Sequence, residues 1–521
     1  MKRIRIFLYI VVFTIFSGDA VLGQRYLTLQ DLPQKIDTRV YYSVFVRSFY
    51  DSNGDGIGDI QGLISKLDYL QDLGIEGLWL LPVQPSPSYH KYDVTDYYGI
   101  DPEYGTLKDY RQLVSEAHKR HMKILLDLVV NHTSNLHPWF QQAIANPKSS
   151  YRNYYIWTGD TAVINRDRYH WYAVKDQDGN KLPGERYFGF FWSGMPDLNF
   201  DNKKVRKEII KIARFWSEKI GVDGFRLDAA RHIYPDDEIN KTLAWWDEFN
   251  EQIHTRSASP WLVGEITGGT ENTVPFLANG LDATFNFTLA GLIDRSVKEE
   301  SDLGIVDSCL SITRRYLQAN PNAEDAIFLT NHDMNRIMTE LKGNQEQARI
   351  AASLLLTLPG NPFIYYGEEI GMLGKKPDEY IREPFLWNIE GEDQGQTSWE
   401  IPYRSSSRTV KPLAFQKKDP RSLYNHYRHL IHTRNNSRAL RQGWLVPFGG
   451  HHREIVSFLR ELPDERVLVL INLTGAIQKL DWPQGLDPVK VLYGTHKVFK
   501  KGEKIIYLQP YATFILQTRV N

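Results

Sequence analysis

Three acidic residues in this chain each follow a short apolar run, at the point where a buried strand would reach solvent. They are Asp228 in GFRLDAARH, Glu265 in WLVGEIT and Asp333 in FLTNHDMN. Acids at the ends of parallel strands converge on one pocket if those strands line a single barrel. Such a set suits general acid–base and nucleophilic chemistry on a neutral, polar substrate. For any one of these acids taken alone, the alternative is a structural ion pair.

The residues around two of the acids favour different protonation states. Arg226 lies two residues before Asp228, so both side chains face the same side of a strand. A guanidinium at that position would keep Asp228 ionised and orient it. Glu265 follows an apolar run, and a partly closed apolar site would raise the pKa of its carboxyl and retain its proton. One ionised and one protonated carboxyl are what a retaining glycosidase requires.

The region from residue 38 to about 440 alternates strand-like and helix-like segments. Amphipathic stretches such as Leu107–Arg120 and Lys203–Lys219 have apolar residues at helical spacing. Eight β/α units predict a (β/α)8 TIM barrel with its active site at the carboxyl ends of the strands. The eight predicted strands are Val40–Ser48, Gly77–Leu81, Ile124–Val130, Gly224–Asp228, Leu262–Glu265, Ala283–Phe287, Ile327–Thr330 and Pro362–Tyr366.

Two further regions depart from the β/α alternation. The connection after the third strand is too long for a simple loop, so we expect an inserted domain over residues 132–197. The barrel then comprises residues 24–131 and 198–440. From 441 to 521 only short strands are predicted, which indicates a separate C-terminal antiparallel β-sandwich. Its predicted strands are Ile455–Leu459, Val467–Leu470, Val489–Leu492, Lys504–Leu508 and Ala512–Gln517.

The loop after the first strand places oxygen-bearing side chains at alternate positions between glycines. This pattern resembles a calcium loop, although the glutamate that completes an EF-hand is replaced by Gly62. The alternative is a polar turn without a metal. A second calcium site is expected between barrel and insertion, from Asn131, Asp197 and the carbonyl of His232. The predicted ligands of the first site are Asp51, Asn53, Asp55, Asp59 and the carbonyl oxygen of Ile57.

The first 23 residues have a basic start, an 11-residue apolar run and small residues at a plausible cleavage site. We expect a signal peptide, and therefore a secreted or periplasmic protein without a stable membrane anchor; a retained anchor is the alternative. The formal net charge of −1 argues against a nucleic-acid partner. The single cysteine, Cys309, excludes an intrachain disulfide. A monomer is expected.

Together, the predicted barrel, insertion and sandwich resemble the α-amylase family of glycoside hydrolases, family 13, over essentially the whole mature chain. The resemblance rests on the motifs DLVVNH, GFRLDAARH, GEI, TNHD and MPDLN, which occur in family order. It implies that Asp228 is the nucleophile, Glu265 the general acid/base and Asp333 the acid that holds sugar hydroxyls. It also implies a set of residues that bind the sugar chain: His90, Tyr92, His132, Arg226, Arg231, His232, His332, Asp378 and Arg382.

The resemblance implies a retaining, calcium-containing hydrolase of α-1,4 bonds in starch or maltooligosaccharides. Ala229, next to the predicted nucleophile, is valine in many relatives that prefer α-1,6 bonds. The alternatives are an exo-acting α-glucosidase, including an α-1,6 one, a 4-α-glucanotransferase, or a non-catalytic glycan-binding protein. The intact acid set disfavours the last. For Asp378 and Arg382, an i,i+4 salt bridge is an equal alternative to sugar binding.

Overall fold

The computed structural model describes residues 38–520 apart from 168, 176–180, 256, 451, 483–485 and 495–504. The predicted signal peptide over residues 1–23 therefore lies outside the described part. Within the described residues, no helix is both long enough and apolar enough to cross a membrane.

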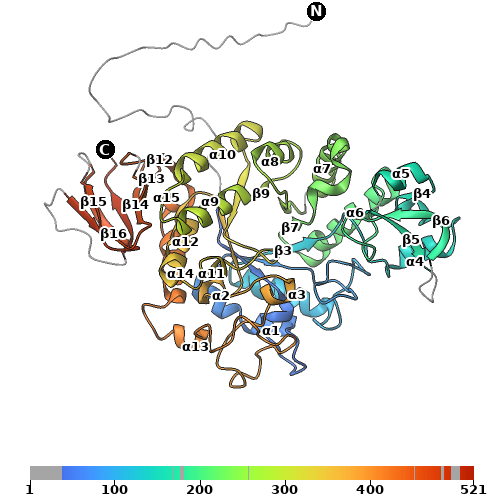
Figure 1. The fold of residues 1–521 in the computed structure, drawn as a ribbon, viewed down its shortest axis with the longest axis horizontal. Helices are drawn as coiled ribbons and strands as arrows, with labels where there is room; N and C mark the ends of the chain where they lie inside the picture. Colours follow the sequence, from blue (N-terminus) through green and yellow to red (C-terminus); the bar gives the residue numbers. More distant parts are fainter. Residues whose placement is uncertain are drawn as a thin grey trace, which may run out of the picture. The chain divides into compact units, whose positions relative to one another are not determined.

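Eight parallel strands form a closed barrel, as the sequence predicts (Figure 1). Most of their residues are buried, which suits strands that are covered on both faces. The strands are β1 (Tyr41–Val44), β2 (Gly77–Leu80), β3 (Lys123–Leu128), β7 (Gly224–Leu227), β8 (Trp261–Gly264), β9 (Ala283–Phe285), β10 (Glu324–Phe328) and β11 (Asn361–Tyr365). Around the barrel they follow the order β1-β11-β10-β9-β8-β7-β3-β2.

Aromatic side chains fill the barrel interior and fix the relative positions of its strands. The ring of Phe363 on β11 stacks on Tyr41 with centroids 4.7 Å apart and contacts Phe285 at 4.9 Å. Trp79 on β2 reaches the same cluster, 5.3 Å from Phe285. Rigid rings packed across the interior leave little freedom for the strand ends that carry the acids.

Helices connect the barrel strands, and their ends carry the expected capping residues. The helix α3 begins after Thr106, whose hydroxyl accepts from Asp109 N while Asp109 bonds back to Thr106 N, forming a capping box. The helix expected over 203–219 changes at Phe215 into one π-helical segment, η3 (Phe215–Ile220), which ends at Gly221 with a φ of 91°. The helices of the barrel region are α1 (Ile60–Ser65), α2 (Leu67–Leu73), α3 (Leu107–Lys119), α6 (Lys203–Arg214), α7 (Ile239–Ile253), α8 (Thr270–Leu277), α9 (Phe287–Lys298), α10 (Ile305–Ala319), α11 (Ile337–Glu340), α12 (Gln345–Thr357), α13 (Leu413–Gln416), α14 (Leu423–Asn435) and α15 (Arg438–Gln442).

The connection between β3 and α6 contains a small sheet with strand order β4-β6-β5. Its elements are α4 (Pro138–Ala145), β4 (Trp157–Thr158), α5 (Thr161–Arg166), β5 (Trp171–Lys175) and β6 (Lys181–Phe188). They fall inside the predicted insertion over residues 132–197.

The C-terminal region is antiparallel, as predicted, with a five-stranded sheet and a two-stranded sheet. The sequence analysis missed β12 (Trp444–Pro447) and β15 (Gln478–Asp481), which are short and only partly buried. The sheet orders are β12-β13-β14-β18-β16 and β15-β17, with β13 (Ile455–Glu461), β14 (Arg466–Asn472), β16 (Pro488–Gly494), β17 (Ile505–Leu508) and β18 (Thr513–Thr518).

The central strands of the larger C-terminal sheet, β13, β14 and β18, are buried on both faces. Residues such as Val467 and Val469 of β14 belong to the same core as the barrel helices, whereas the alternate residues Leu468 and Leu470 pack with Leu480 of β15. Buried Arg460 of β13 donates to the carbonyl of Thr357, at the end of α12, at 2.7 Å. This sheet is therefore anchored directly on the barrel region.

Candidate active site

The three predicted acids follow strands that run in parallel in the barrel. Asp228 comes directly after β7, Glu265 directly after β8, and Asp333 five residues after the end of β10. All three therefore lie at the carboxyl-terminal end of the barrel, the end where (β/α)8 enzymes hold their active sites.

A single guanidinium joins two of the acids. Arg226 on β7 is 1% exposed, and its Nη1 lies 2.6 Å from Asp228 Oδ1 while its Nη2 lies 2.7 Å from Glu265 Oε2. The two carboxyl groups are thus held side by side on one planar, fixed group.

A fourth acid, which the sequence analysis did not single out, positions this guanidinium. Asp127 on β3 is fully buried and accepts from Arg226 Nη1 at 2.9 Å, from Trp79 Nε1 at 3.1 Å and from the hydroxyl of Tyr92 at 3.0 Å. The sequence signal that could have identified Asp127 is the DLVVNH motif. Its aspartate faces the barrel interior, two residues before the chain leaves the strand. Asp127 links the strand-end acids to the aromatic core.

The third acid has its own cationic partners. Asp333 Oδ1 lies 2.8 Å from Arg382 Nη2, and its Oδ2 lies 3.2 Å from His332 Nε2. Arg382 also lies 3.3 Å from Asp378, so the alternative i,i+4 salt bridge is present in this structure. Arg382 therefore lies between Asp378 and the catalytic-site acid Asp333.

The predicted sugar-binding aromatics and histidines surround the acids. The rings of Tyr92 and His332 stack with an interplanar angle of 10°, and the Tyr92 hydroxyl lies 2.6 Å from His332 Nε2. His90 Nδ1 accepts from Tyr92 N at 3.1 Å, which leaves its Nε2 as the donor in the neutral ring. His132 is buried, and its Nε2 lies 3.1 Å from the carbonyl oxygen of Tyr92, so it helps to hold the backbone of that tyrosine in place.

Burial and charge set the protonation of the acids in opposite ways. Burial raises the pKa of Asp228 and of Glu265, and Arg226 opposes the rise at both. At Asp333 burial acts in the same direction, but the charges and hydrogen bonds of His332 and Arg382 outweigh it and hold the pKa well below its usual range. Asp333 thus stays ionised, whereas burial favours the protonated form of both Asp228 and Glu265 and Arg226 limits that effect at both.

The 190–192 segment of the insertion lies against the site. Phe190 stacks on His232 at 4.2 Å, and Phe191 contacts His132 edge-on at 5.2 Å. Arg231 instead pairs with Asp236 at 3.0 Å. Sequence reasoning missed the two phenylalanines because exposed aromatic residues in an insertion have no diagnostic spacing.

Ala229 occupies a left-handed backbone conformation, with φ 46° and ψ 37°, directly after the predicted nucleophile. Left-handed backbone costs roughly 1–2 kcal/mol for a residue with a side chain. The turn directs Ala229 N toward Glu265 Oε2, at 3.4 Å. A strained residue next to reacting groups is a frequent feature of active sites.

The predicted calcium loop folds tightly on itself. Asp51 accepts from the backbone N–H groups of residues 53, 54 and 56, and Asp59 accepts from those of residues 52 and 62. Among the described residues, none of the carboxylates of Asp51, Asp55 and Asp59 is in an ion pair, although Asp51 and Asp59 are buried. Three carboxylates without an ion pair in nine residues are compatible with a bound cation, although backbone N–H groups already hydrogen-bond Asp51 and Asp59 and Asp55 is exposed.

This loop also contacts a distant segment after β11. Asp51 N donates to the carbonyl of Gly395 at 2.8 Å, and Ser398 N donates to the carbonyl of Gly56 at 2.8 Å. Among the described residues, no three His, Cys, Asp or Glu side chains are grouped as metal ligands. Any site at this loop would therefore need the amide and carbonyl oxygens of Asn53 and Ile57 beside its carboxylates.

The residues of the second expected calcium site also lie together. Asn131 Nδ2 lies 2.5 Å from the carbonyl oxygen of His232. Burial raises the pKa of Asp197 to about 7, despite hydrogen bonds from Phe190 N and Asn131. A buried carboxyl beside an amide and a carbonyl fits a calcium ligand set once the Asn131 amide turns its oxygen inward.

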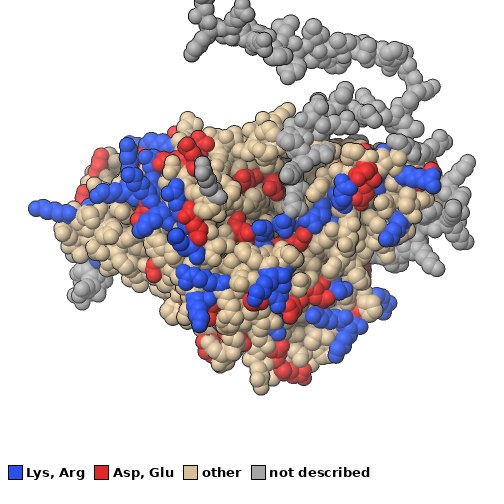
Figure 2. Space-filling view, turned by 180° about the vertical axis from the view of Figure 1, so that it is seen from behind, with Lys and Arg blue, Asp and Glu red and all other residues tan. Residues whose placement is uncertain are grey.

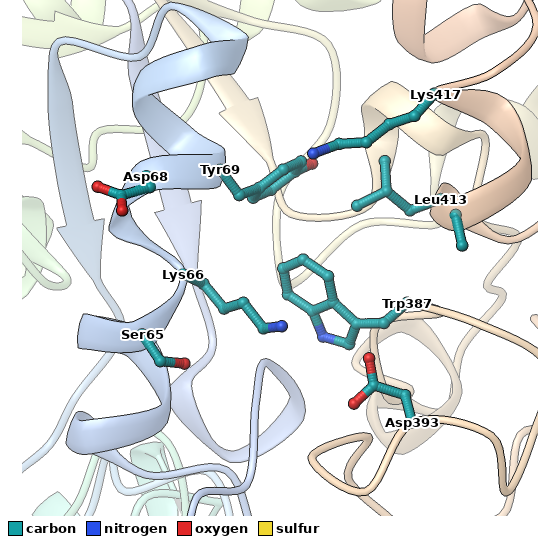
Figure 3. Close-up of a pocket in the computed structure, with 9 residues that line it drawn as sticks. Ser65, Lys66, Asp68, Tyr69, Trp387, Asp393, Leu413 and Lys417 are labelled. Atoms are coloured by element: carbon teal, nitrogen blue, oxygen red, sulfur yellow. The ribbon is translucent and has the colours of Figure 1, made fainter.

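A separate hollow of about 420 Å³ contains none of the predicted site residues (Figure 3). The ammonium of Lys66 lies 3.6 Å from the ring centroid of Tyr50 and 4.4 Å from that of Trp387, and Lys417 lies over Tyr69. The Asp393 carboxylate in its wall accepts from the Tyr50 hydroxyl. These contacts join α1–α2 to the segment after β11, and we read the hollow as structural.

Charge on the face shown in Figure 2 does not indicate a charged partner. Both signs occur over the face shown in Figure 2, and neither covers it alone. This agrees with the formal net charge of −1 and with a neutral substrate.

Comparison with known proteins matches two family models to this chain. The α-amylase catalytic domain matches residues 43–443, and the C-terminal domain of the α-amylase SusG matches residues 455–515. "Alpha-amylase 3" of Dictyoglomus thermophilum is 45% identical over 478 residues, covering 92% of this chain and 93% of that protein. A 4-alpha-glucanotransferase of Thermotoga neapolitana is 34% identical over 397 residues, covering 74% and 84%.

A solved structure gives the same result at the level of the fold. The crystal structure of the alpha-amylase from H. orenii superposes with a TM-score of 0.82 at 40% identity, covering 93% of this chain and 100% of that one. With a catalytic-domain match over most of its length and the acids assembled at the barrel end, this chain belongs to the α-amylase family of glycoside hydrolases, family 13, and acts on α-glucans.

Proposed function

We propose that this enzyme hydrolyses α-1,4-glucosidic bonds of starch and maltooligosaccharides with retention, through a covalent glycosyl-Asp228 intermediate. The observation that carries the proposal is the guanidinium of Arg226, which holds Asp228 at 2.6 Å and Glu265 at 2.7 Å. A retaining enzyme needs a nucleophile and an acid/base close together, and a shared cation provides that arrangement.

Each acid has one task in this reaction. Asp228 attacks the anomeric carbon while Glu265 gives its proton to the departing glycosidic oxygen, so the sugar is left as an ester of Asp228. Glu265 then takes a proton from water, whose oxygen attacks the same carbon and releases the Asp228 carboxylate. Ionised Asp333, fixed by His332 and Arg382, stabilises positive charge at the sugar ring and holds its hydroxyls.

The linkage is argued from the space beside the nucleophile. Ala229 has only a methyl group where relatives specific for α-1,6 bonds commonly have valine, which leaves room for an α-1,4-linked chain. We assign His232, stacked on Phe190, to the leaving-group side, together with Arg231. Little action on isomaltose or sucrose is expected.

Three alternatives remain within or near the family. An exo-acting α-glucosidase, including an α-1,6 enzyme, would differ in the loops around the same acids. A glucanotransferase would pass the sugar from Asp228 to a sugar hydroxyl, and a relative at 34% identity is named for that activity. A non-catalytic glycan-binding protein has no need for the paired acids on Arg226.

Two calcium sites are part of the proposal. The first comprises Asp51, Asn53, Asp55, Asp59 and the carbonyl of Ile57, and its support is that these three carboxylates form no ion pair with any described residue. The second comprises Asn131, Asp197 and the carbonyl of His232, and its support is the buried carboxyl of Asp197. At either site calcium would stabilise the loop; it has no step in the chemistry.

We further propose that residues 1–23 are a signal peptide and that the mature enzyme is a secreted or periplasmic monomer. Support comes from the basic start and the apolar run of that segment. Mass determination of the protein recovered from culture medium or periplasm would test the cleavage, and light scattering the monomer. An intact N-terminus in a membrane fraction would contradict the signal-peptide assignment.

Two variants test the assignment of the acids. Asp228→Asn removes the nucleophile and Glu265→Gln the proton donor, so each should lower kcat on maltooligosaccharides by several orders of magnitude. An α-glucosyl fluoride, whose leaving group needs little protonation, should restore the glycosylation step of Glu265→Gln but not of Asp228→Asn. Near-normal turnover by Asp228→Asn would show that the nucleophile is misassigned.

A further inference from the structure

The segment after β11 brings two stacked aromatic pairs to the side of Arg382. Tyr89 stacks on Trp399 at 5.3 Å, and Tyr380 stacks on Tyr403 at 5.1 Å with an interplanar angle of 28°. The first pair is largely covered, whereas the Tyr403 side chain is 65% exposed. An exposed aromatic residue alone is ordinary, but this one is paired and lies near the site.

The backbone around Tyr403 is held in place by a buried carboxylate. The buried carboxylate of Glu383 accepts from the N–H groups of Tyr403, Arg404 and Ser405 at 2.8, 2.7 and 2.6 Å. Ser405 Oγ also donates to the carbonyl of Leu373 at 2.6 Å. Because the backbone is already ordered, a ligand that stacks on Tyr403 would pay little entropy to fix it.

The exposed ring is joined to the region of Asp333 through its partner Tyr380. Tyr380 lies in the short 3₁₀ helix η7 (Asp378–Ile381), two residues after Asp378. Arg382 connects the two acids, at 2.8 Å from Asp333 and 3.3 Å from Asp378. The Tyr380–Tyr403 pair therefore flanks the side of the site on which Asp378 and Arg382 are assigned to the second sugar.

We propose that Tyr403, supported by Tyr380, forms an outer glucose-binding subsite on the non-reducing side, beyond the sugar held by Asp378 and Arg382. An aromatic face suits the apolar C–H face of a glucose unit. The guanidinium of Arg404, 4.7 Å from the Tyr403 ring centroid, supplies donors for the sugar hydroxyls around that face. This inference rests on the proposed function and adds a chain-length preference to it.

The test compares long with short substrates. In Tyr403→Ala, the ratio of kcat/KM for maltohexaose to that for maltotriose should fall about tenfold, the order expected for one lost stacking contact. Tyr403→Phe should retain the wild-type ratio, because the ring face rather than the hydroxyl binds the sugar. Tyr507→Ala removes an exposed tyrosine of β17 in the C-terminal region and serves as the matched control.

Two outcomes would overturn the subsite. One is an unchanged ratio in Tyr403→Ala; the other is an equal loss on both substrates, which would indicate damage to η7 instead. Calorimetric binding of maltohexaose to the Asp228→Asn background separates this proposal from the proposed function. Weaker binding with Tyr403→Ala in that background supports the subsite even if the linkage cleaved proves to be different, and equal binding contradicts it.

Discussion

At the scale of single residues, the chemistry depends on how Arg226 is shared between Asp228 and Glu265. Burial raises the pKa of both carboxyls, and the guanidinium limits the rise. A rise at Glu265 helps catalysis because the proton donor must be protonated. A rise at Asp228 hinders it because the nucleophile must be ionised, so the active form exists only between the two pKa values.

We expect a bell-shaped dependence of kcat/KM on pH. As pH falls, Asp228 gains a proton above its ordinary value of 3.8 and activity is lost; as pH rises, Glu265 loses its proton above its ordinary value of 4.5 and activity is lost again. Glu265→Gln, assayed with α-glucosyl fluoride, should keep the acidic limb and lose the alkaline one. Persistence of the alkaline limb in that variant would assign it to another group.

The strained turn at Ala229 predicts an order of stability. Valine there adds a branched side chain in left-handed backbone, so Ala229→Val should lower the free energy of unfolding by about 1–3 kcal/mol. Ala229→Gly accepts the same backbone without a side chain and should be at least as stable as the wild type, apart from the higher entropy of its unfolded chain. Thermal unfolding of the three proteins measures this order. A valine variant as stable as the wild type would mean that the turn carries no strain.

The sequence predicted the acids better than the residues that position them. Asp228, Glu265 and Asp333 stand at strand exits, where an acid is unusual and therefore informative. Asp127 lies inside a buried apolar strand, and its role follows only from the three-dimensional meeting of β3 with β7. Phe190 could not be predicted either, because its contact with His232 depends on how the insertion folds back.

At the scale of elements, all eight barrel strands were predicted, because each contains a short buried apolar run, although β10 begins three residues earlier than predicted, with the partly buried Glu324 and Asp325. The first was predicted too long: only Tyr41–Val44 is strand, and a 3₁₀ turn, η1 (Val46–Ser48), follows it. The strands β12 and β15 were missed because they are short and partly exposed, which removes the apolar alternation that identifies a strand.

We predict that calcium bound to the loop after β1 stabilises the enzyme. Removing calcium with a chelator should lower the melting temperature; at a hundredfold excess over Kd a bound ion is worth about 2.7 kcal/mol. Asp55→Ala should show most of that loss without chelator and should keep only the smaller response that belongs to the second site.

Asp96→Ala is the matched control for the calcium loop. Asp96 is likewise an exposed aspartate whose carboxylate accepts from the N–H two residues ahead, as Asp55 does. Its variant should keep the response to the chelator. If the chelator leaves the melting temperature of the wild type unchanged, calcium does not stabilise the fold.

At the scale of the whole molecule, two buried arginines meet the end of α12, and one of them, Arg460, connects the C-terminal sheet to the barrel region. Arg460 of β13 donates to the carbonyls of Thr357 and Gly443, and Arg434 of α14 donates to those of Leu356 and Leu358. The cations thus lie at the carboxyl end of α12, where the helix dipole is negative. Burial lowers the pKa of Arg460 to about 10, which still leaves it charged at neutral pH.

Arg460→Met should therefore destabilise the whole enzyme without changing its chemistry. Two buried carbonyls lose their donor, so we expect a loss of about 1–3 kcal/mol in the free energy of unfolding at unchanged kcat. Arg438→Met removes an exposed arginine that pairs with Asp464 on the surface, and it should change stability by less than about 1 kcal/mol. Denaturant unfolding compares the two; similar small losses would show that the contact with α12 is dispensable.

One stretch of chain, residues 393–405, contacts the proposed calcium loop at one end and carries Tyr403 at the other. Gly395 and Ser398 bond to the backbone of the loop, and Tyr403 follows five residues later. If an ion in the loop and a long glucan on Tyr403 both order this stretch, the two binding events are coupled. Each ligand must then raise the affinity of the protein for the other by the same factor. Starch-length substrates would then protect the enzyme against chelators, whereas maltose, whose two units are too few to reach Tyr403, would not.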